Sequence, residues 1–295
     1  MWGSHCEECS TPLVNRGRFS PGFIGQSHSQ VLRGTLRTCL DNIAYNTLPY
    51  NFSRVLLLPQ FARNSGEQFF LSLALAFRAM ISEFRREPER AQALSAEVIL
   101  LSAENGFPDW LTLGHLIHGS AWFELGQLLR GVAELEEAIA DCRRIGGYPR
   151  QQYYISLVAH TYARMGQSEK GLAMLNQALT EIERTGEKVD QAEILRLKGE
   201  TLLIQDPGTS DQAEVCFRAA LGVARAQEVK WWELRSAVSL ARRLRASGRG
   251  DEARLLLTEI YTWFTEGFDT ADLKDAKALL AGCGKTNSLS EYHVS

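Results

Sequence analysis

The chain lacks long apolar runs, a strong excess of charge of either sign, and proline in quantity. Apolar stretches such as 55–58 and 98–101 are short, and none approaches the ~20 residues that a membrane-spanning helix needs. The 32 basic and 35 acidic residues give a net charge of −3, which argues against a nucleic-acid or anionic-membrane binder. Eight prolines and 24 glycines in 295 residues exclude collagen-like and low-complexity architectures. We therefore expect a globular protein with no direct nucleic-acid partner and no membrane partner.

Cysteine is also sparse. The chain has six, scattered along its length: Cys6, Cys9, Cys39, Cys142, Cys216 and Cys283. The first ten residues, MWGSHCEECS, include acidic side chains and lack the apolar segment of a secretory signal peptide. We therefore predict a cytoplasmic location without a disulfide framework.

The sequence repeats itself with a period of about forty residues. The segments 126–139 and 166–179 are similar, and their register extends along the chain. Small residues stand at the start of each register: Ala91, Gly131, Gly171, Ala213 and Ala253. Four residues later stand Ser95, Leu135, Leu175, Phe217 and Leu257, and seven residues later stand Val98, Ala138, Ala178, Ala220 and Ile260. Five agreeing registers predict a repeat architecture.

Each unit has the pattern of two helices. The apolar residues of 132–142 and 172–182 fall on one helical face, and Gly106, Gly146 and Gly186 follow as expected C-cap glycines. The small–large–small spacing within units is typical of tetratricopeptide repeats (TPRs): Gly119–Trp122–Gly131, Ala159–Tyr162–Gly171, Gly199–Leu202–Ala213 and Ala241–Leu244–Ala253. We predict an all-α, right-handed superhelical TPR-like α-solenoid of about five repeats of ~40 residues, whose first helices line a concave face.

The forty-residue register divides the chain into three segments. Residues 1–58 break it and are rich in Ser, Asn and Gly, so we expect an irregular, disordered or non-native segment there. Residues 59–281 form the predicted repeat domain, which ends in a helix at 269–281. Residues 282–295 are predicted to be a flexible tail.

Four stretches, 84–110, 192–203, 231–244 and 261–280, carry a family resemblance. They resemble the C-terminal TPR region of large bacterial signal-transduction ATPases and of adenylate/guanylate cyclase-type multidomain regulators. In that family catalytic domains precede the repeats, so the resemblance implies a regulatory or scaffolding role and supplies no catalytic residue. Residues 1–58 do not resemble the family where another repeat is expected; a frameshift, a misassigned start or a truncated gene would explain this.

Several short motifs resemble phosphate-binding or metal-binding sites but have a simpler interpretation. Gly284-Lys285-Thr286 resembles the end of a phosphate-binding loop, but its first glycine is missing and it follows a helix. His5, Cys6 and Cys9 lack the second tight ligand pair of a zinc ribbon. His115 and His118 lie one turn apart with no evident carboxylate on the same face. We therefore expect no metal and no cofactor, and we interpret Trp122, Trp231, Trp232 and Trp263 as packing between repeats.

The concave face is the remaining candidate site. Projection of the first-helix positions places eight residues there: Ser120, Phe123, His160, Arg164, Arg196, Glu200, Arg235 and Arg242. The four arginines among them could hold an acidic peptide or a C-terminal carboxylate through forked hydrogen bonds. They could equally form a solvated face, and the sequence leaves both interpretations open.

These observations predict a protein–protein interaction scaffold rather than an enzyme. Its partner would be a protein or peptide on the concave face, or the neighbouring domains of a signal-transduction ATPase or nucleotide cyclase that this chain regulates. A free-standing adaptor for an acidic peptide is the alternative. An enzyme with cyclase or ATPase activity is a third, but the sequence shows neither a βα phosphate-binding unit nor metal-binding aspartates on strands.

Overall fold

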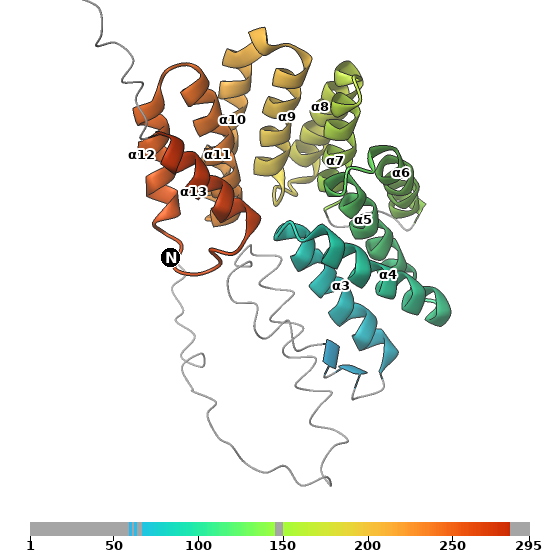
Figure 1. Ribbon diagram of the computed structural model, residues 1–295. Coiled ribbons are helices and arrows are strands. Elements are labelled where there is room, and N and C mark those ends of the chain that lie inside the picture. The colour runs from blue at the N-terminus through green and yellow to red at the C-terminus, as the bar shows by residue number, and fades with distance from the viewer. Residues whose placement is uncertain (1–58, 61, 64–66, 145–149, 284–295) are drawn as a thin grey trace, which may run out of the picture.

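The computed structural model describes residues 59–60, 62–63, 67–144 and 150–283. The predictions for residues 1–58, for Gly146 and for the Gly284-Lys285-Thr286 motif lie outside these ranges. Within them every regular element is a helix (Figure 1), which confirms the all-α prediction. None of the helices in these ranges is long and apolar enough to cross a membrane.

The helices form consecutive helix–turn–helix pairs. The pairs are α3 (Gln68–Phe84) with α4 (Pro88–Asn105), α5 (Pro108–Glu124) with α6 (Leu128–Arg144), α7 (Gln151–Arg164) with α8 (Ser168–Thr185), α9 (Gln191–Gln205) with α10 (Ser210–Ala226), and α11 (Lys230–Ala246) with α12 (Gly250–Tyr261). A 3₁₀ turn, Pro207–Thr209, lies between α9 and α10. The final helix, α13 (Ala271–Cys283), packs against α11 and α12 and ends two residues beyond the predicted boundary.

Local sequence sets the ends of several helices. Pro88 and Pro108 stand in the first turn of α4 and α5, where the missing N–H would have no helical partner. Gly106 and Gly186 end α4 and α8 in the left-handed conformation, at φ 68° and 75°, as the sequence predicted.

The repeated positions form the core between helices. All fifteen residues of the three registers are buried, from Ala91 to Ile260. The small members allow close approach: a Cβ on Gly131 would lie 2.5 Å from the Phe123 ring, and a Cβ on Gly199 would lie 2.5 Å from the Phe217 ring. The period of forty residues therefore reports the packing of each helix pair on its neighbour.

Gly171 tests this packing most sharply, because an added Cβ there would overlap the backbone carbonyl oxygen of Ala159, which cannot move aside. We expect Gly171→Ala to lower the free energy of unfolding by about 1–2 kcal/mol, since overpacking outweighs the gain in helix propensity. Gly222 in α10 is the matched control, because nothing lies within 4 Å of its added Cβ. Gly222→Ala should stabilise by about 0.5–1 kcal/mol in the same urea titration, and equal effects would contradict the packing account.

The first helix pair also contacts the last helices, which lie far away in sequence: 151 residues separate Phe84 from Arg235, and 184 separate Arg85 from Asp269. Figure 1 shows the pairs following a curved path that brings α13 near the end of α3. Arg85 bonds to Asp269 at 2.8 Å, and Arg235 donates to the Phe84 carbonyl oxygen at 2.7 Å. The Phe84 ring lies 4.7 Å from the Trp231 ring, centroid to centroid. Simple solenoid repeats contact only their neighbours, so these contacts close the superhelix on itself.

An aromatic cluster holds this closure together. It consists of the buried rings of Phe84, Tyr153, Tyr154, Trp231 and Trp232. The predicted packing role of Trp231 and Trp232 is thus confirmed. The prediction was wrong for Trp263, which is 52% exposed. Trp122 is half-buried between α5 and α6: the Arg130 guanidinium lies 3.8 Å from its ring centroid, and its Nε1 donates to Glu134 at 3.2 Å.

Candidate functional site

The closed superhelix surrounds a cavity of about 310 Å³. Residues of the first helices α3, α5, α7, α9 and α11 line most of it, and α13 completes the wall. The first helices thus lie on the inner side of the array, where the sequence projection placed the candidate binding residues. Because each repeat contributes its first helix, a ligand in this cavity would touch the whole repeat array at once.

Seven of the eight residues projected onto the concave face line the cavity: Ser120, Phe123, His160, Arg164, Arg196, Arg235 and Arg242. Glu200 is not part of the lining. Its carboxylate instead lies 3.4 Å from Arg196 Nη1 and accepts a bond from the Ser239 hydroxyl at 2.7 Å. Phe123 and Ser120 are buried, at 7% and 4% exposure, so they shape the wall more than they offer contact area.

Two of the four projected arginines, Arg196 and Arg235, are held in short hydrogen-bonded ion pairs within the protein, whereas Arg242 has only the longer contact to Asp275 at 3.5 Å. Arg196 donates from Nε and Nη2 to the two oxygens of the buried Glu193, at 2.7 Å each. Burial alone would raise the pKa of Glu193, but the Arg196 charge and its hydrogen bonds hold it below the ordinary value. Arg235 donates from Nε to Asp272 at 2.8 Å. A forked bond from either arginine to a ligand would require these pairs to break.

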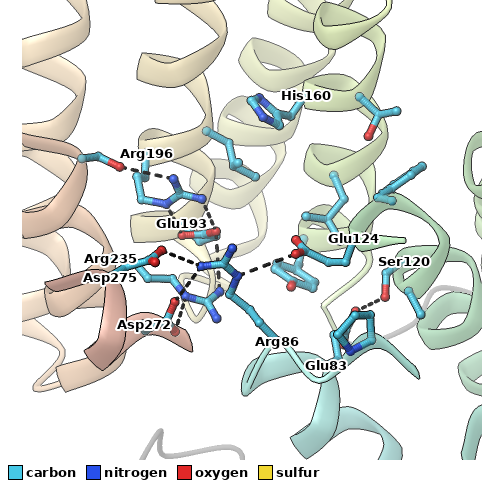
Figure 2. A pocket seen from close by; sticks show the side chains of 18 of the residues that line it. Glu83, Arg86, Ser120, Glu124, His160, Glu193, Arg196, Arg235, Asp272 and Asp275 are labelled. Carbon is cyan, nitrogen blue, oxygen red and sulfur yellow. Dashed lines mark hydrogen bonds and ion pairs between the residues drawn. The ribbon is translucent and has the colours of Figure 1, made fainter. Parts of the chain in front are cut away.

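Sequence reasoning missed a group of charged residues in the cavity lining, which Figure 2 shows around Arg86. Arg86, in the turn after α3, lies 3.0 Å from Asp275, 3.5 Å from Asp272 and 3.7 Å from Glu124. Asp272 and Asp275 are three residues apart on α13, so one helical face carries both carboxylates. The only signal in the sequence was this acidic spacing, since nothing in it indicated that α13 lies beside the first repeat.

Glu83 lies at the C-terminal end of α3 and also lines the cavity. The Ser120 hydroxyl donates to one of its carboxylate oxygens, and the Tyr154 hydroxyl donates to the other at 3.2 Å. Burial raises the pKa of Glu83 to about 7, although these hydroxyls and the Arg150 charge favour the ionised form. One carboxyl group therefore joins three successive repeats and titrates near neutral pH.

The raised pKa of Glu83 has a consequence for stability. Because its folded pKa lies above the ordinary value of 4.5, its stabilising effect is complete below about pH 4.5 and is lost as pH rises through about 7. We expect Glu83→Gln, which does not titrate, to gain stability relative to wild type across this range, by up to about 1.4 kcal/mol per pH unit. Urea unfolding at pH 5, 6, 7 and 8 measures the difference, with Glu183→Gln on exposed α8 as control. A difference independent of pH would contradict the assignment.

His160 lines the cavity as a neutral imidazole. Burial and the nearby Arg196 charge lower its pKa to about 4. Its Nδ1 lies 3.3 Å from the Thr201 hydroxyl oxygen. His160 can therefore offer a hydrogen bond to a ligand without adding a positive charge.

His115 and His118 differ from the sequence expectation, because a carboxylate does lie beside them. Glu134 of α6 has oxygens 2.9 Å from Nδ1 of each histidine. Burial would raise the pKa of Glu134, but its hydrogen bonds to both histidines lower it to about 2. Within the described part of the chain, no group of three metal-ligating side chains has a geometry that could hold a metal ion. The three residues form a structural link between α5 and α6.

Comparison with known proteins identifies the fold through solved structures. No protein-family model matches the chain, and no curated protein matches it in sequence. Solved structures do match. A Rap protein complexed with Competence and Sporulation Factor has a TM-score of 0.61 at 14% identity, over 88% of this chain and 76% of that one. Bacillus thuringiensis PlcR, in complex with the peptide PapR7 and DNA, has a TM-score of 0.59 at 12% identity, over 87% of this chain and 96% of PlcR.

A third solved structure belongs to a signal transduction ATPase with numerous domains from Pyrococcus horikoshii, which carries a tetratricopeptide-repeat sensor. It matches with a TM-score of 0.55 at 11% identity, over 87% of this chain and 40% of that protein. The chain therefore spans less than half the length of that ATPase. The three matches show that the fold is a TPR-like α-solenoid. At these identities the likeness concerns the fold alone.

Proposed function

We propose that this TPR-like α-solenoid is a protein-interaction module that binds a segment of a partner protein or peptide inside its cavity. The observation that carries the proposal is the enclosure of the cavity by the first helices of all five repeats and by α13. A volume of about 310 Å³ is at the lower end of ligand pockets, which suits a short segment and not a folded domain.

The exposed arginines of the lining, Arg164 and Arg242, are the groups we propose to contact an acidic part of the partner. We call them the rim arginines. Within the described residues, Arg164 has no carboxylate within 4.0 Å, and Arg242 has only Asp275, at 3.5 Å. Arg196 and Arg235 stay in their internal pairs and support the wall. The acidic-peptide proposal thus rests on two arginines instead of four.

We further propose that the module serves a regulatory or sensory role in the cytoplasm, as part of a signal-transduction ATPase or nucleotide cyclase system, and that it binds rather than turns over its partner. The Rap and PlcR structures, each solved as a complex, and the repeat sensor of the Pyrococcus ATPase support this role by analogy of fold. A free-standing adaptor with the same cavity is the alternative.

The rim arginines give the direct test. We expect Arg164→Glu combined with Arg242→Glu to reduce partner capture from cell extract at least tenfold, because two charge-assisted hydrogen bonds are replaced by repulsion. The matched control is Arg143→Glu with Arg254→Glu, which makes the same charge change on exposed positions of α6 and α12. Quantitative pull-down measures both variants. Capture of the same proteins by wild type and the rim variant would refute the cavity as the binding site.

A further inference from the structure

The charges that line the cavity are almost completely matched. Five carboxylates line it, and four of them lie within 4.0 Å of an arginine nitrogen: Glu124, Glu193, Asp272 and Asp275. Five arginines line it, and four of them are paired in return: Arg86, Arg196, Arg235 and Arg242. The protein therefore neutralises most of the cavity without a ligand.

One carboxylate and one guanidinium are left over. Within the described ranges, Glu83 has no basic nitrogen within 4.0 Å of its oxygens, and its direct contacts are the hydroxyls of Ser120 and Tyr154. Arg164 likewise has no carboxylate partner among the described residues. The two unmatched groups have opposite charge and differ in exposure, since Glu83 is half-buried and Arg164 is exposed.

The surroundings of Glu83 suit a cationic group. A carboxylate has about four acceptor positions, and the hydroxyls of Ser120 and Tyr154 use two of them. These hydroxyls also hold the carboxylate in place, as Figure 2 shows for Ser120. The Arg150 charge that acts on Glu83 is already paired with Asp190. A half-buried carboxylate without a direct ion-pair partner is costly, so a ligand that supplies this partner gains more there than at the surface.

We infer that the cavity binds a zwitterionic peptide segment, with an ammonium or guanidinium group against Glu83 and a carboxylate against Arg164. The inference rests on the proposed function and adds the order of charge along the ligand. The cationic group enters first and reaches the inner end of the cavity. The acidic group stays at the rim, where the planar Arg164 guanidinium can hold it through two hydrogen bonds.

Peptide selection on the immobilised full chain tests this directly. The probes are heptapeptides of Gly, Ser and Ala with acetylated and amidated ends, carrying one Lys, one Asp, both at varied spacing, or neither. A second set replaces Lys with a free amino terminus, which separates a side-chain cation from a terminal one. We expect wild type to retain peptides with both charges about tenfold more than peptides with either charge alone.

Two variants separate the subsites. Glu83→Gln keeps the side-chain volume: its carbonyl oxygen can accept from one of the two hydroxyls, and its amide N–H can donate to the oxygen of the other. It should abolish the preference for the cation while the preference for Asp remains. Arg164→Gln should do the reverse. Glu183→Gln and Arg254→Gln, on the exposed sides of α8 and α12, should change neither preference. The helical circular dichroism signal shows whether each variant is folded. Because Arg164 is exposed, Arg164→Gln should not disturb the fold, and it tests the charge order independently of Glu83.

The outcomes distinguish this inference from the function on which it rests. Retention that ignores the cation, or a preference that survives Glu83→Gln, overturns the charge order. Loss of protein capture in the rim-arginine variant would still support the cavity as the binding site in that case. If wild type retains no peptide of either set, the zwitterionic ligand is refuted, and the pull-down decides separately whether the cavity binds a partner.

Discussion

Trp232→Ala is expected to lower the free energy of unfolding by about 3–5 kcal/mol, because it removes the largest fully buried side chain among the residues that the structure describes. The indole has no exposed surface and packs edge-on against Phe84 and Trp231, with centroid distances of 6.2 and 5.3 Å. These rings come from the first and last helix pairs. Their loss leaves a void where the superhelix closes, and urea unfolding measures its cost.

Trp232→Ala also tests whether the contact between the first and last helix pairs stabilises both of them. Hydrogen exchange should accelerate in α3 as well as in α11, since both lose the packing that joins them. Phe268→Ala is the control, because its ring is 47% exposed, and we expect a change of less than about 1 kcal/mol. Faster exchange confined to α11 would show that the first repeat does not depend on this contact.

Arg150→Ala is expected to have an effect of similar size, about 3–5 kcal/mol, for an electrostatic reason. Arg150 Nη2 bonds to Asp190 Oδ1 at 2.5 Å, and the two side chains are only 11% and 4% exposed. The guanidinium also lies 4.5 Å from the centroid of the Phe84 ring. Burial raises the pKa of Asp190 to about 6 even with Arg150 present, so its removal leaves an uncompensated buried carboxylate. Urea unfolding at pH 8 measures the loss.

A second substitution identifies the cause. Asp190→Asn in the Arg150→Ala background should recover much of the lost stability, because the uncompensated charge is removed along with its partner. Arg218→Ala, which breaks the exposed contacts to Glu214 and Glu252, should cost less than about 1 kcal/mol. A double variant as unstable as Arg150→Ala alone would assign the effect to packing on Phe84 instead of to charge.

The repeat architecture was predictable because its information is local. Gly131 and Gly171 of the forty-residue register each lie against the backbone of the preceding helix, at Gly119 and Ala159, so sequence spacing and spatial contact agree. The same locality made Pro88 and Gly106 reliable signals for helix ends. The final helix was also predicted at 269–281, and its apolar residues Leu273 and Ala276 are buried against the last pair.

The site was only partly predictable, because closure of the superhelix is not local. First-helix projection found Arg164 and His160, which lie on the concave side of their own repeat. It could not find Arg86, whose partner Asp275 is 189 residues away. For the same reason it could not show that Arg235 is paired with Asp272 and unavailable to a ligand. The curvature that brings these groups together is the sum of small rotations between repeats, and no single motif encodes it.

Site-specific photo-crosslinking in living cells would test the central claim, that the partner binds inside the closed superhelix. A photoreactive phenylalanine analogue would replace Leu157, which lines the cavity, or Leu129, which is 74% exposed on α6. A partner bound inside the cavity should crosslink from position 157 and not from position 129, and the crosslink should be lost when Arg164 and Arg242 are reversed in charge. Crosslinking from position 129 with none from position 157 would place the partner on the outer face and contradict the account.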